Sequence, residues 1–431
     1  MPTSEKEIKH KKMKRVLIVN GTAIGEKSGT GITLENLWCD YPKKSILQLR
    51  VDYSDCQYNT EYETVSTPIE FCQIPNRISR KRRAKAAVRP SATISLNASI
   101  TQSGVKAILH DGIRGLLDSW PVHFGCINKK IDCFLPEVVY TCGASIRILK
   151  TALYYSERYS APIVLHLMDD WPSTLYTTSK YSAMFRAIML RYLRKIAKRS
   201  LQSFAISNAL AEKYAQIFGI EMLPLMNPAS DIASSVNVRK SEVVKFVYAG
   251  SLSLNRWKSL LDIARILLAE RKQGVPNRFN LYIPVNALTK EMQEAFEKNG
   301  ATLHPYVQHA ELLKIYRESD VMVFAESFDE NVARFTRYSL STKIPEYMGT
   351  GNAILAYLPA DSHASDYIKA RRIGFVANNE AELKTQIHII LTCRDKCYSV
   401  ANCALEMVIA EHSESSERKK LYESLQKDFS S

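Results

Sequence analysis

The stretch SLSTKIPEYMGTGNAIL, residues 339–355, decides the fold of the second half of the chain. Its polar first part predicts a short helix, and the run AILAYL (353–358) that completes it is apolar, as buried strands are. Gly349 and Gly351 are expected to stop the helix and turn the chain tightly into that strand. A helix followed at once by a buried strand is one step of a parallel α/β sheet.

The start of the same helix has a charge pattern that predicts a ligand. A helix N-terminus offers unpaired N–H groups and a positive dipole end, which suit phosphate, and Lys343 adds a full charge there. Ser341 or Thr342 can cap the first amides. Glu346, one turn on, is expected to accept hydrogen bonds from two ribose hydroxyls. The stretch predicts a nucleoside diphosphate site; an ordinary capped surface helix is the alternative.

Outward from this stretch, strands and helices alternate through the second half of the chain. The predicted strands are 243–251, 280–285, 301–307, 321–327, 353–358 and 374–377, and the predicted helices are 256–272, 288–300, 310–320, 361–372 and 380–394. This alternation predicts a doubly wound, Rossmann-like domain at 236–405. The remaining residues, 406–431, are expected to form a helical tail that packs back on the N-terminal domain.

The first half shows the same alternation with a weaker pattern. The predicted strands are 15–20, 45–49, 137–140, 162–168 and 203–207, and the predicted helices are 32–40, 144–157 and 182–199. A polar stretch at 224–242 reads as the linker, so the N-terminal domain is expected at 1–235. A chain of 431 residues suits two cores of this size. The predicted fold is α/β, with two doubly wound Rossmann-like domains facing across a ligand-binding cleft.

Composition predicts a cytoplasmic protein. The chain is 46% hydrophobic and 24% charged, and it has no apolar run of the roughly 18–20 residues that span a bilayer. The N-terminus has no apolar segment of the kind found in signal peptides. Its nine cysteines are scattered without a CxxC pair, which indicates reduced thiols.

The net charge of +14 is concentrated in two places. One is a basic run at 77–89, and the other is the helix at 183–201, where an apolar face lies opposite basic residues. Such features suit an anionic membrane surface, nucleic acid or an acidic substrate. A solvated loop and an ordinary core-packed helix are the alternatives.

Three stretches resemble the GT-B glycosyltransferases, in particular the retaining, glycogen-synthase-like family-four enzymes of bacterial envelope-sugar type. They are VYAGSLSLNRWKSLLDIARIL (247–267), AELLKIYRESDVMVF (310–324) and STKIPEYMGTGNAIL (341–355). In the first half, GTGITLENL (29–37) and PIVLHLMDDWP (162–172) are similar to the glycine loop and a later strand of that class.

The resemblance implies a glycosyltransferase that moves a sugar from a nucleoside-diphosphate sugar to a glycan or lipid-linked acceptor in bacterial surface polysaccharide synthesis. It implies catalytic roles for Asp169, Arg256 and Lys343, with Lys258 a weaker fit than Arg256. The donor nucleotide is expected at Gly29, Gly31, Gly250, Arg256, Ser341, Thr342, Lys343 and Glu346. A peripheral position on the inner face of the membrane follows from the lipid-linked acceptor and the basic elements.

The chain departs from the family pattern at two positions. Tyr338 stands where the first of two glutamates is common, and Met168 precedes Asp169 where a histidine is common. No DxD sequence is present, so arginine, lysine and a helix end are expected to replace a metal ion. We therefore predict a retaining, metal-independent transferase with no cofactor.

Three other functions fit parts of the sequence. A nucleotide-sugar epimerase or a non-catalytic nucleotide-sugar-binding protein would share the architecture. A Rossmann oxidoreductase is disfavoured because GTAIGEKSGTG (21–31) does not match GxGxxG after the first strand. A nucleic-acid-binding protein would use the run at 77–89, but no aromatic stacking motif accompanies it, so no nucleic acid partner is expected.

Overall fold

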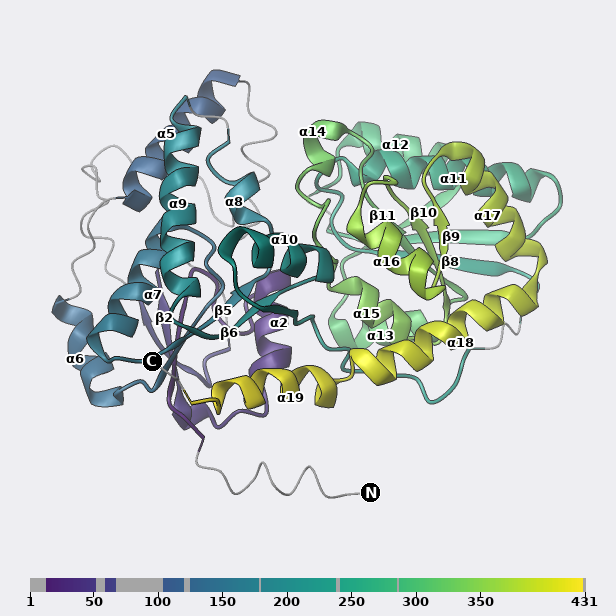
Figure 1. Ribbon diagram of the computed structural model, residues 1–431. Coiled ribbons are helices and arrows are strands. Elements are labelled where there is room, and N and C mark those ends of the chain that lie inside the picture. The colour runs from purple at the N-terminus through teal and green to yellow at the C-terminus, as the bar shows by residue number, and fades with distance from the viewer. Residues whose placement is uncertain are drawn as a thin grey trace. The chain divides into compact units, whose positions relative to one another are not determined.

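The computed structural model describes residues 13–51, 59–66, 104–119, 125–177, 180–237, 241–284 and 287–428 (Figure 1). The described chain forms two compact units. Unit 1 contains the residues up to Leu225 together with those from Arg418 onward, and unit 2 is Met226–Glu417. The basic run at 77–89 lies outside the described residues. None of the helices in the described ranges combines the length and hydropathy that a membrane span requires.

Unit 1 is built on a seven-stranded sheet in the order β3-β2-β1-β4-β5-β6-β7. The strands are β1 (Val16–Asn20), β2 (Ile46–Arg50), β3 (Glu63–Ser66), β4 (Val138–Thr141), β5 (Ile163–Leu167), β6 (Ser200–Ala205) and β7 (Met222–Pro224). Neighbouring strands of this sheet pair in parallel. β1, β2, β4 and β5 are buried at every position, as strands covered by helices on both faces must be.

The helical segments of unit 1 connect these strands. They are α2 (Gly29–Trp38), η1 (Lys43–Ser45), α5 (Gly104–Ser119), α6 (Gly125–Phe134), α7 (Ile146–Arg158), α8 (Trp171–Thr174), α9 (Ser182–Ala197) and α10 (Asn208–Phe218). Serines begin three of them: Ser28, Ser145 and Ser207 each accept a hydrogen bond from an amide of the first turn.

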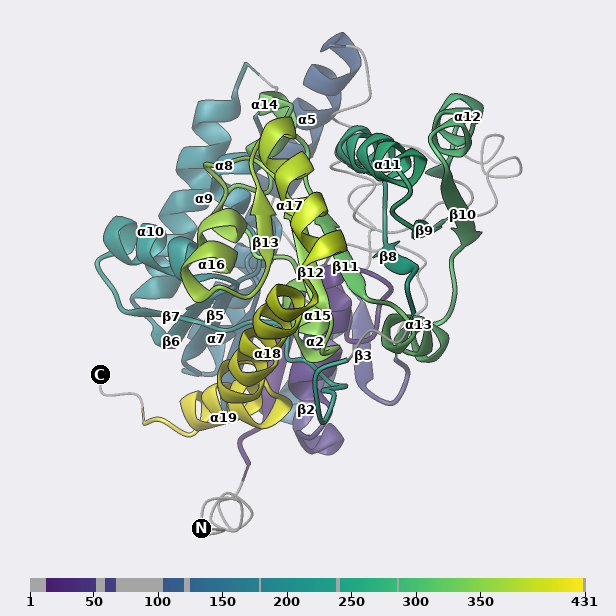
Figure 2. The same ribbon diagram turned by 90° about the vertical axis from the view of Figure 1, so that its right-hand side faces the viewer.

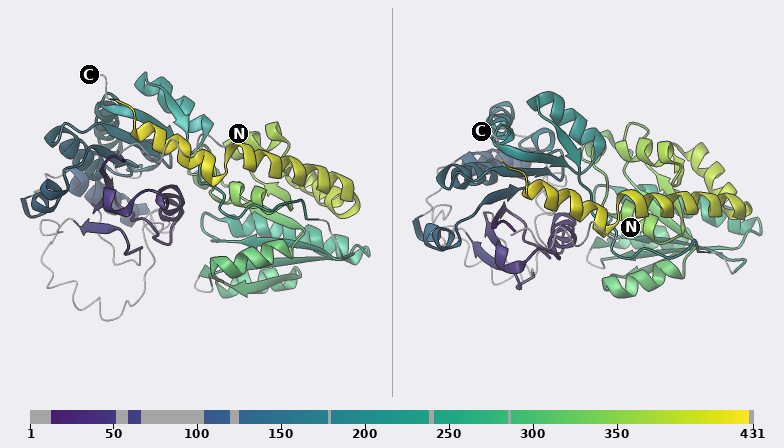
Figure 3. Two further views of the ribbon diagram at one scale, coloured as in Figure 1. Left: turned by 90° about the horizontal axis from the view of Figure 1, so that it is seen from below. Right: turned by 60° about the horizontal axis from the view of Figure 1, so that its bottom comes forward.

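The C-terminal segment adds a last helix to unit 1. α18 (Arg394–Glu411) is followed by α19 (Glu414–Leu425), both drawn in yellow in Figure 3. Arg418 Nε donates to the carbonyl of Asn36 at 2.7 Å, and the Tyr422 hydroxyl donates to the carbonyl of Leu37 at 2.9 Å. The Tyr422 ring also packs edge-on against Tyr41. Residues from the two ends of the chain therefore share one unit.

Unit 2 is built on a six-stranded sheet in the order β10-β9-β8-β11-β12-β13. The strands are β8 (Val244–Ala249), β9 (Asn277–Ile283), β10 (Ala301–Pro305), β11 (Val321–Ala325), β12 (Ala353–Tyr357) and β13 (Phe375–Ala377). All neighbours pair in parallel. Numbered within the unit, the strand order is 3-2-1-4-5-6. Strands are added toward one edge of the sheet up to β10 and toward the other edge from β11 onward, so the switch point lies between β8 and β11. Ligands of such sheets bind outside the carboxyl ends of the strands at this switch point.

Helices cover both faces of the unit 2 sheet (Figure 2). They are α11 (Arg256–Lys272), α12 (Lys290–Lys298), α13 (His309–Arg317), α14 (Glu330–Ala333), α15 (Lys343–Gly349), α16 (His363–Arg371), α17 (Glu380–Thr392) and α18. Alternate strand residues enter two separate cores. Val321 and Val323 of β11 pack on the α11 and α17 side, and Met322 packs on the side of α15 and α18.

The structure confirms the predicted α/β class and the two parallel sheets. It adds two strands that the sequence did not predict, β3 and β7, and it changes two helix ends near glycines. The first helix begins at Gly29 instead of Ile32, because Ser28 caps it through the Gly31 amide. α15 does not stop before Gly349, which is its last helical residue. The turn is made by Gly351, whose φ of 73° lies in the left-handed region that favours glycine.

Gly349 has a packing role that its sequence did not reveal. A Cβ on this residue would lie 3.2 Å from the carbonyl oxygen of Asp231, and its own carbonyl accepts from the Ala233 amide at 2.8 Å. The segment that follows β7 therefore crosses closely over the end of α15, and a side chain at Gly349 would require that segment to move by a few tenths of an ångström.

Candidate functional site

The loop between β8 and α11 shapes one side of the unit 2 switch point. Gly250 leaves the strand with a φ of 150°, and Leu254 and Asn255 have φ of 61° and 57° just before the helix. The Tyr248 hydroxyl donates to the carbonyl of Ser251 at 2.6 Å and ties the loop back to the strand. These turns bring Arg256, the first residue of α11, to the carboxyl end of the sheet.

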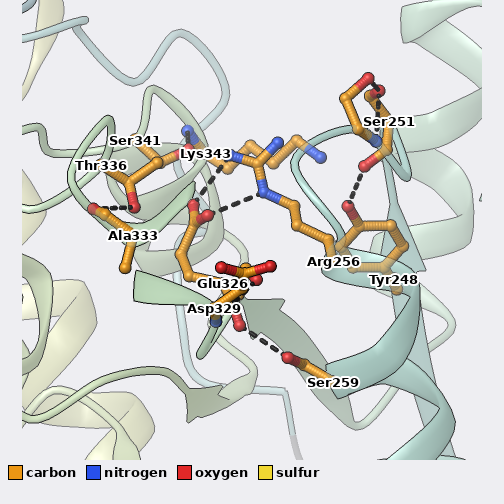
Figure 4. Close-up of polar contacts among 12 residues, drawn as sticks. Tyr248, Ser251, Arg256, Ser259, Glu326, Asp329, Ala333, Thr336, Ser341 and Lys343 are labelled. Carbon is orange, nitrogen blue, oxygen red and sulfur yellow. Dashed lines mark hydrogen bonds and ion pairs between the residues drawn. The ribbon is translucent and has the colours of Figure 1, made fainter. Parts of the chain in front are cut away.

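Arg256 makes a two-pronged ion pair with Glu326, which directly follows β11 (Figure 4). Its Nε donates to Oε2 at 2.9 Å and its Nη2 donates to Oε1 at 3.0 Å. One turn along α11, the Ser259 hydroxyl donates to the backbone carbonyl of Glu326 at 2.7 Å. The first turn of α11 is thus fastened to the end of β11 through both the side chain and the backbone of Glu326.

Lys343, the first residue of α15, reaches into the same place and lies beside Arg256 in Figure 4. Its ammonium donates to the carbonyl of Ala249 and lies 4.9 Å from the centre of the Tyr248 ring. A Cβ on Gly250 would collide with this ammonium, so the glycine makes room for it. Burial, and then the charge of Arg256, lowers the pKa of Lys343 to about 8.

The remaining predicted residues of α15 lie around this lysine. Ser341 Oγ accepts from the Lys343 amide at 3.4 Å, whereas Thr342 occupies the N-cap position without a side-chain bond. Among the described residues, the buried Oε1 atom of Glu346 has no hydrogen-bond partner, and His309 Nδ1 lies 3.7 Å from it. Burial raises the pKa of Glu346, and the nearby His309 and Lys343 charges oppose that rise.

Six predicted residues lie in unit 2: Gly250, Arg256, Ser341, Thr342, Lys343 and Glu346. Two cations, Arg256 and Lys343, lie at the switch point of the sheet, where ligands of this architecture bind. Such an arrangement can hold a dianionic phosphate group. Glu346 offers a buried carboxylate oxygen that can accept a hydroxyl.

The other predicted residues, Gly29, Gly31 and Asp169, belong to unit 1. Asp169 follows β5 and accepts from the amide of Asp170 at 2.8 Å. Gly31 lies against the backbone of Glu26, where a Cβ would collide, and its amide donates to Ser28. Gly29 is the first residue of α2. Roles for these residues toward a donor stay predictions.

Sequence reasoning missed Glu326 and Tyr248. Glu326 is an acidic residue placed directly after a buried strand, much as Asp169 is, and that position was the available signal. Its pairing with Arg256 joins residues seventy positions apart, which no local pattern reveals. Within the described residues, no group of three or more His, Cys, Asp or Glu side chains could hold a metal ion.

The architecture defines a class. Two parallel α/β sheets, one with the order 3-2-1-4-5-6 and the other extending it by one strand, match the GT-B fold of glycosyltransferases over nearly the whole chain. The chain therefore has the GT-B fold that the resemblance predicted. No family profile matches the sequence, and no curated protein matches it either.

Individual solved structures show how far the likeness extends. HepE of Anabaena, solved with UDP and glucose, shares 14% identity with a TM-score of 0.60 over 96% of this chain and all of its own (100%). The sucrose-phosphate synthase of Thermosynechococcus elongatus shares 11% with a TM-score of 0.59, over 95% and 98%. The UDP-forming trehalose-phosphate synthase of Burkholderia vietnamiensis shares 10% with a TM-score of 0.57, over 96% and 99%. At these identities the likeness establishes the fold.

Proposed function

We propose that this chain is a glycosyltransferase that moves a sugar from a nucleoside-diphosphate sugar to a glycan or lipid-linked acceptor. The observation that carries the proposal is the pair of cations, Arg256 and Lys343, at the switch point of the second GT-B sheet. A donor of this kind carries its negative charge on two phosphates, and this is the chemistry that such a pair recognises.

The same cations account for catalysis. Breaking the anomeric C–O bond leaves negative charge on the departing diphosphate, and groups already in place for that charge lower the barrier. Removing one such donor typically costs about 2.7–4 kcal/mol of transition-state stabilisation. Arg256 and Lys343 take this role, together with the amides at Ser341 and Thr342, and Glu346 accepts the ribose hydroxyls. A retaining outcome is part of the proposal and requires no nucleophile from the protein, and Asp169 orients the acceptor or acts as its base.

The proposal includes a metal-independent reaction. Its support is the arrangement of the donor site itself, in which an arginine and a lysine supply two positive charges. The sequence has no DxD motif of the kind that holds a divalent ion in other glycosyltransferases. Transfer should then persist at full rate in excess EDTA, and loss of activity there with recovery on adding Mg²⁺ would contradict this part.

The site of action in the proposal is the cytoplasmic face of a bacterial membrane, in surface polysaccharide synthesis. α9 and its C-cap residue support it, because their exposed residues include five basic side chains and no acidic one: Arg186, Arg191, Arg194, Lys195 and Lys198. Anionic lipid attracts such a surface. Flotation with vesicles that contain phosphatidylglycerol tests it, and binding that survives neutralisation of these five residues and of Arg80–Arg83 and Lys85 would contradict it.

The donor site is tested by calorimetric titration of the purified protein with UDP, GDP and ADP, without added metal. We expect one nucleotide to bind, and Arg256→Ala and Glu346→Ala each to weaken it strongly. Arg317→Ala is a matched control, since Arg317 pairs with Asp231 elsewhere in unit 2. Absence of binding by a folded wild-type protein would leave only the architecture in common with glycosyltransferases.

A further inference from the structure

We propose that Glu326 is a positioning residue that fixes the guanidinium of Arg256 so that its remaining edge can take a phosphate group. The inference rests on the proposed function only in identifying that phosphate with the donor's diphosphate. It concerns a residue outside the set that the sequence predicted, and it explains why an acid lies beside two cations.

The ion pair uses one edge of the guanidinium and leaves the other open. Glu326 accepts from Nε and Nη2 of Arg256. Within the described residues, neither N–H of Nη1 has a hydrogen bond, and 22% of the Arg256 side chain is exposed. An arginine fork presents five N–H donors in a fixed plane, so holding one edge sets the direction of the other.

Glu326 is itself held from several sides. Its side chain is 6% exposed. Its amide donates to the carbonyl of Tyr357 on β12 at 3.1 Å, and its carbonyl accepts from Ser259. These bonds hold the backbone of Glu326, and burial confines its side chain, so its carboxylate restricts the rotation of the arginine before a ligand arrives. Fixing a binding group in advance lowers the entropic cost of association.

The balance of charge also fits this role. Arg256 and Lys343 lie close enough that the arginine lowers the pKa of the lysine, after the larger effect of burial. Glu326 opposes this effect, because its charge raises the pKa of Lys343. One buried acid thus lets two cations share a small volume while a net positive charge remains for an anion.

Inorganic pyrophosphate is the probe for this inference, because it reports the phosphate contacts without a nucleoside. Its affinity is measured by calorimetry for wild type, Glu326→Gln, Arg256→Ala and the double variant. We expect Glu326→Gln to weaken binding about tenfold in the presence of Arg256 and less than about twofold in its absence. Asp231→Asn, which removes the partner of Arg317 in the same unit, should leave the affinity unchanged.

Other outcomes overturn the inference. Equal weakening in both backgrounds would mean that Glu326 acts on the structure in general. Tighter binding by Glu326→Gln would mean that the carboxylate competes with the phosphate, and failure of the wild type to bind pyrophosphate would also refute the inference. If Glu326→Gln unfolds, Glu326→Asp keeps the charge but is one methylene shorter, and it should weaken binding for the same reason. Pyrophosphate binding without tighter nucleotide binding would refute the proposed function alone.

Discussion

The two sheets of this protein have the same kind of switch point and equip it differently. In unit 1, neutral groups join the ends of β1 and β4: Asn20 Oδ1 accepts from the Cys142 amide at 2.7 Å, and the Thr141 hydroxyl donates to the carbonyl of Val19 at 2.9 Å. The buried charges beside them, Glu26 in the loop after β1 and Arg50 at the end of β2, pair with each other at 3.7 Å. In unit 2, between β8 and β11, the corresponding place holds Arg256 and Glu326, with Lys343 beside them.

The buried carboxylate after β5 in unit 1 has its hydrogen-bond and ion-pair partners within the protein. Asp170, after β5, accepts from Lys213 at one carboxylate oxygen and from the Tyr214 hydroxyl at the other, both at 2.6 Å. Lys213 also donates to Ser173 at 3.0 Å. The two units therefore share a topology with a place for a ligand, and the proposed anion site of unit 2 differs from unit 1 in its surplus of donors.

The largest expected effect separates stability from binding. Lys213→Met leaves the buried Asp170 carboxylate without its cation, and we expect the free energy of unfolding to fall by about 3 kcal/mol. Chemical denaturation measures this, and nucleotide affinity should stay within about twofold. Arg158→Met, which breaks the more exposed pair with Asp132, is the control and should change stability far less. Equal losses of unfolding free energy in the two variants would contradict the role of the buried Asp170–Lys213 pair in stability.

The next effect tests the glycine that accommodates Lys343. A methyl group at Gly250 takes the place of the ammonium, so Gly250→Ala should weaken nucleotide binding by about 2 kcal/mol, roughly thirtyfold. Gly219→Ala is the matched control, because Gly219 has a φ of 66° and no atom lies near its would-be Cβ. It should lower stability through backbone strain without changing affinity. Similar affinity losses in both variants would show that strain, not displacement, is responsible.

A smaller effect concerns pH. Burial lowers the pKa of Lys343 from 10.5 to about 8, so the free protein carries this charge below pH 8 and loses it above. A diphosphate is fully ionised above about pH 7.5 and favours the charged lysine. Affinity should therefore be constant up to about pH 8 and then fall by up to about tenfold per unit. Calorimetry between about pH 7 and 9.5 measures it. Lys343→Arg should flatten the profile, and a flat wild-type profile would exclude this role for Lys343.

The smallest expected effect lies in unit 1. Ser145 begins α7 just beyond the neutral switch point and accepts from the Ile148 amide at 3.2 Å. Ser145→Ala should lower the free energy of unfolding by about 1 kcal/mol, as loss of a helix cap does, and leave nucleotide binding unchanged. Thermal unfolding with and without nucleotide measures both. A change in the nucleotide-induced shift would place this part of unit 1 in the binding site.

The sequence predicted the unit 2 sheet well because its central strands, such as β11 and β12, are continuous buried apolar runs that alternate with helices. The helix predicted at 256–272 has the same bounds in the structure. The sequence did not predict β3 of unit 1, for a physical reason. β3 is the short polar strand ETVS at the edge of the sheet, so it has no apolar run to identify it.

The residues of the candidate site also fall into those that the sequence predicts and those that only the structure reveals. Lys343 and Glu346 point to a ligand through their residue types and their positions at a helix start, both of which are visible in the sequence, whereas Arg256 was predicted from the family resemblance. Glu326 and Gly349 owe their roles to residues far along the chain, Arg256 and Asp231, which local pattern cannot connect. Lone glycines and acids after strands were therefore the positions where the sequence alone was least informative.

The placement of α19 has a consequence for biosynthesis. Domains usually fold as units during synthesis, with the N-terminal one first. Here the contacts of Arg418 and Tyr422 with Asn36 and Leu37 can form only after all of unit 2 has left the ribosome. The first unit to emerge is therefore the last to be completed, and a chain stalled within unit 2 would carry unit 1 without its closing helix.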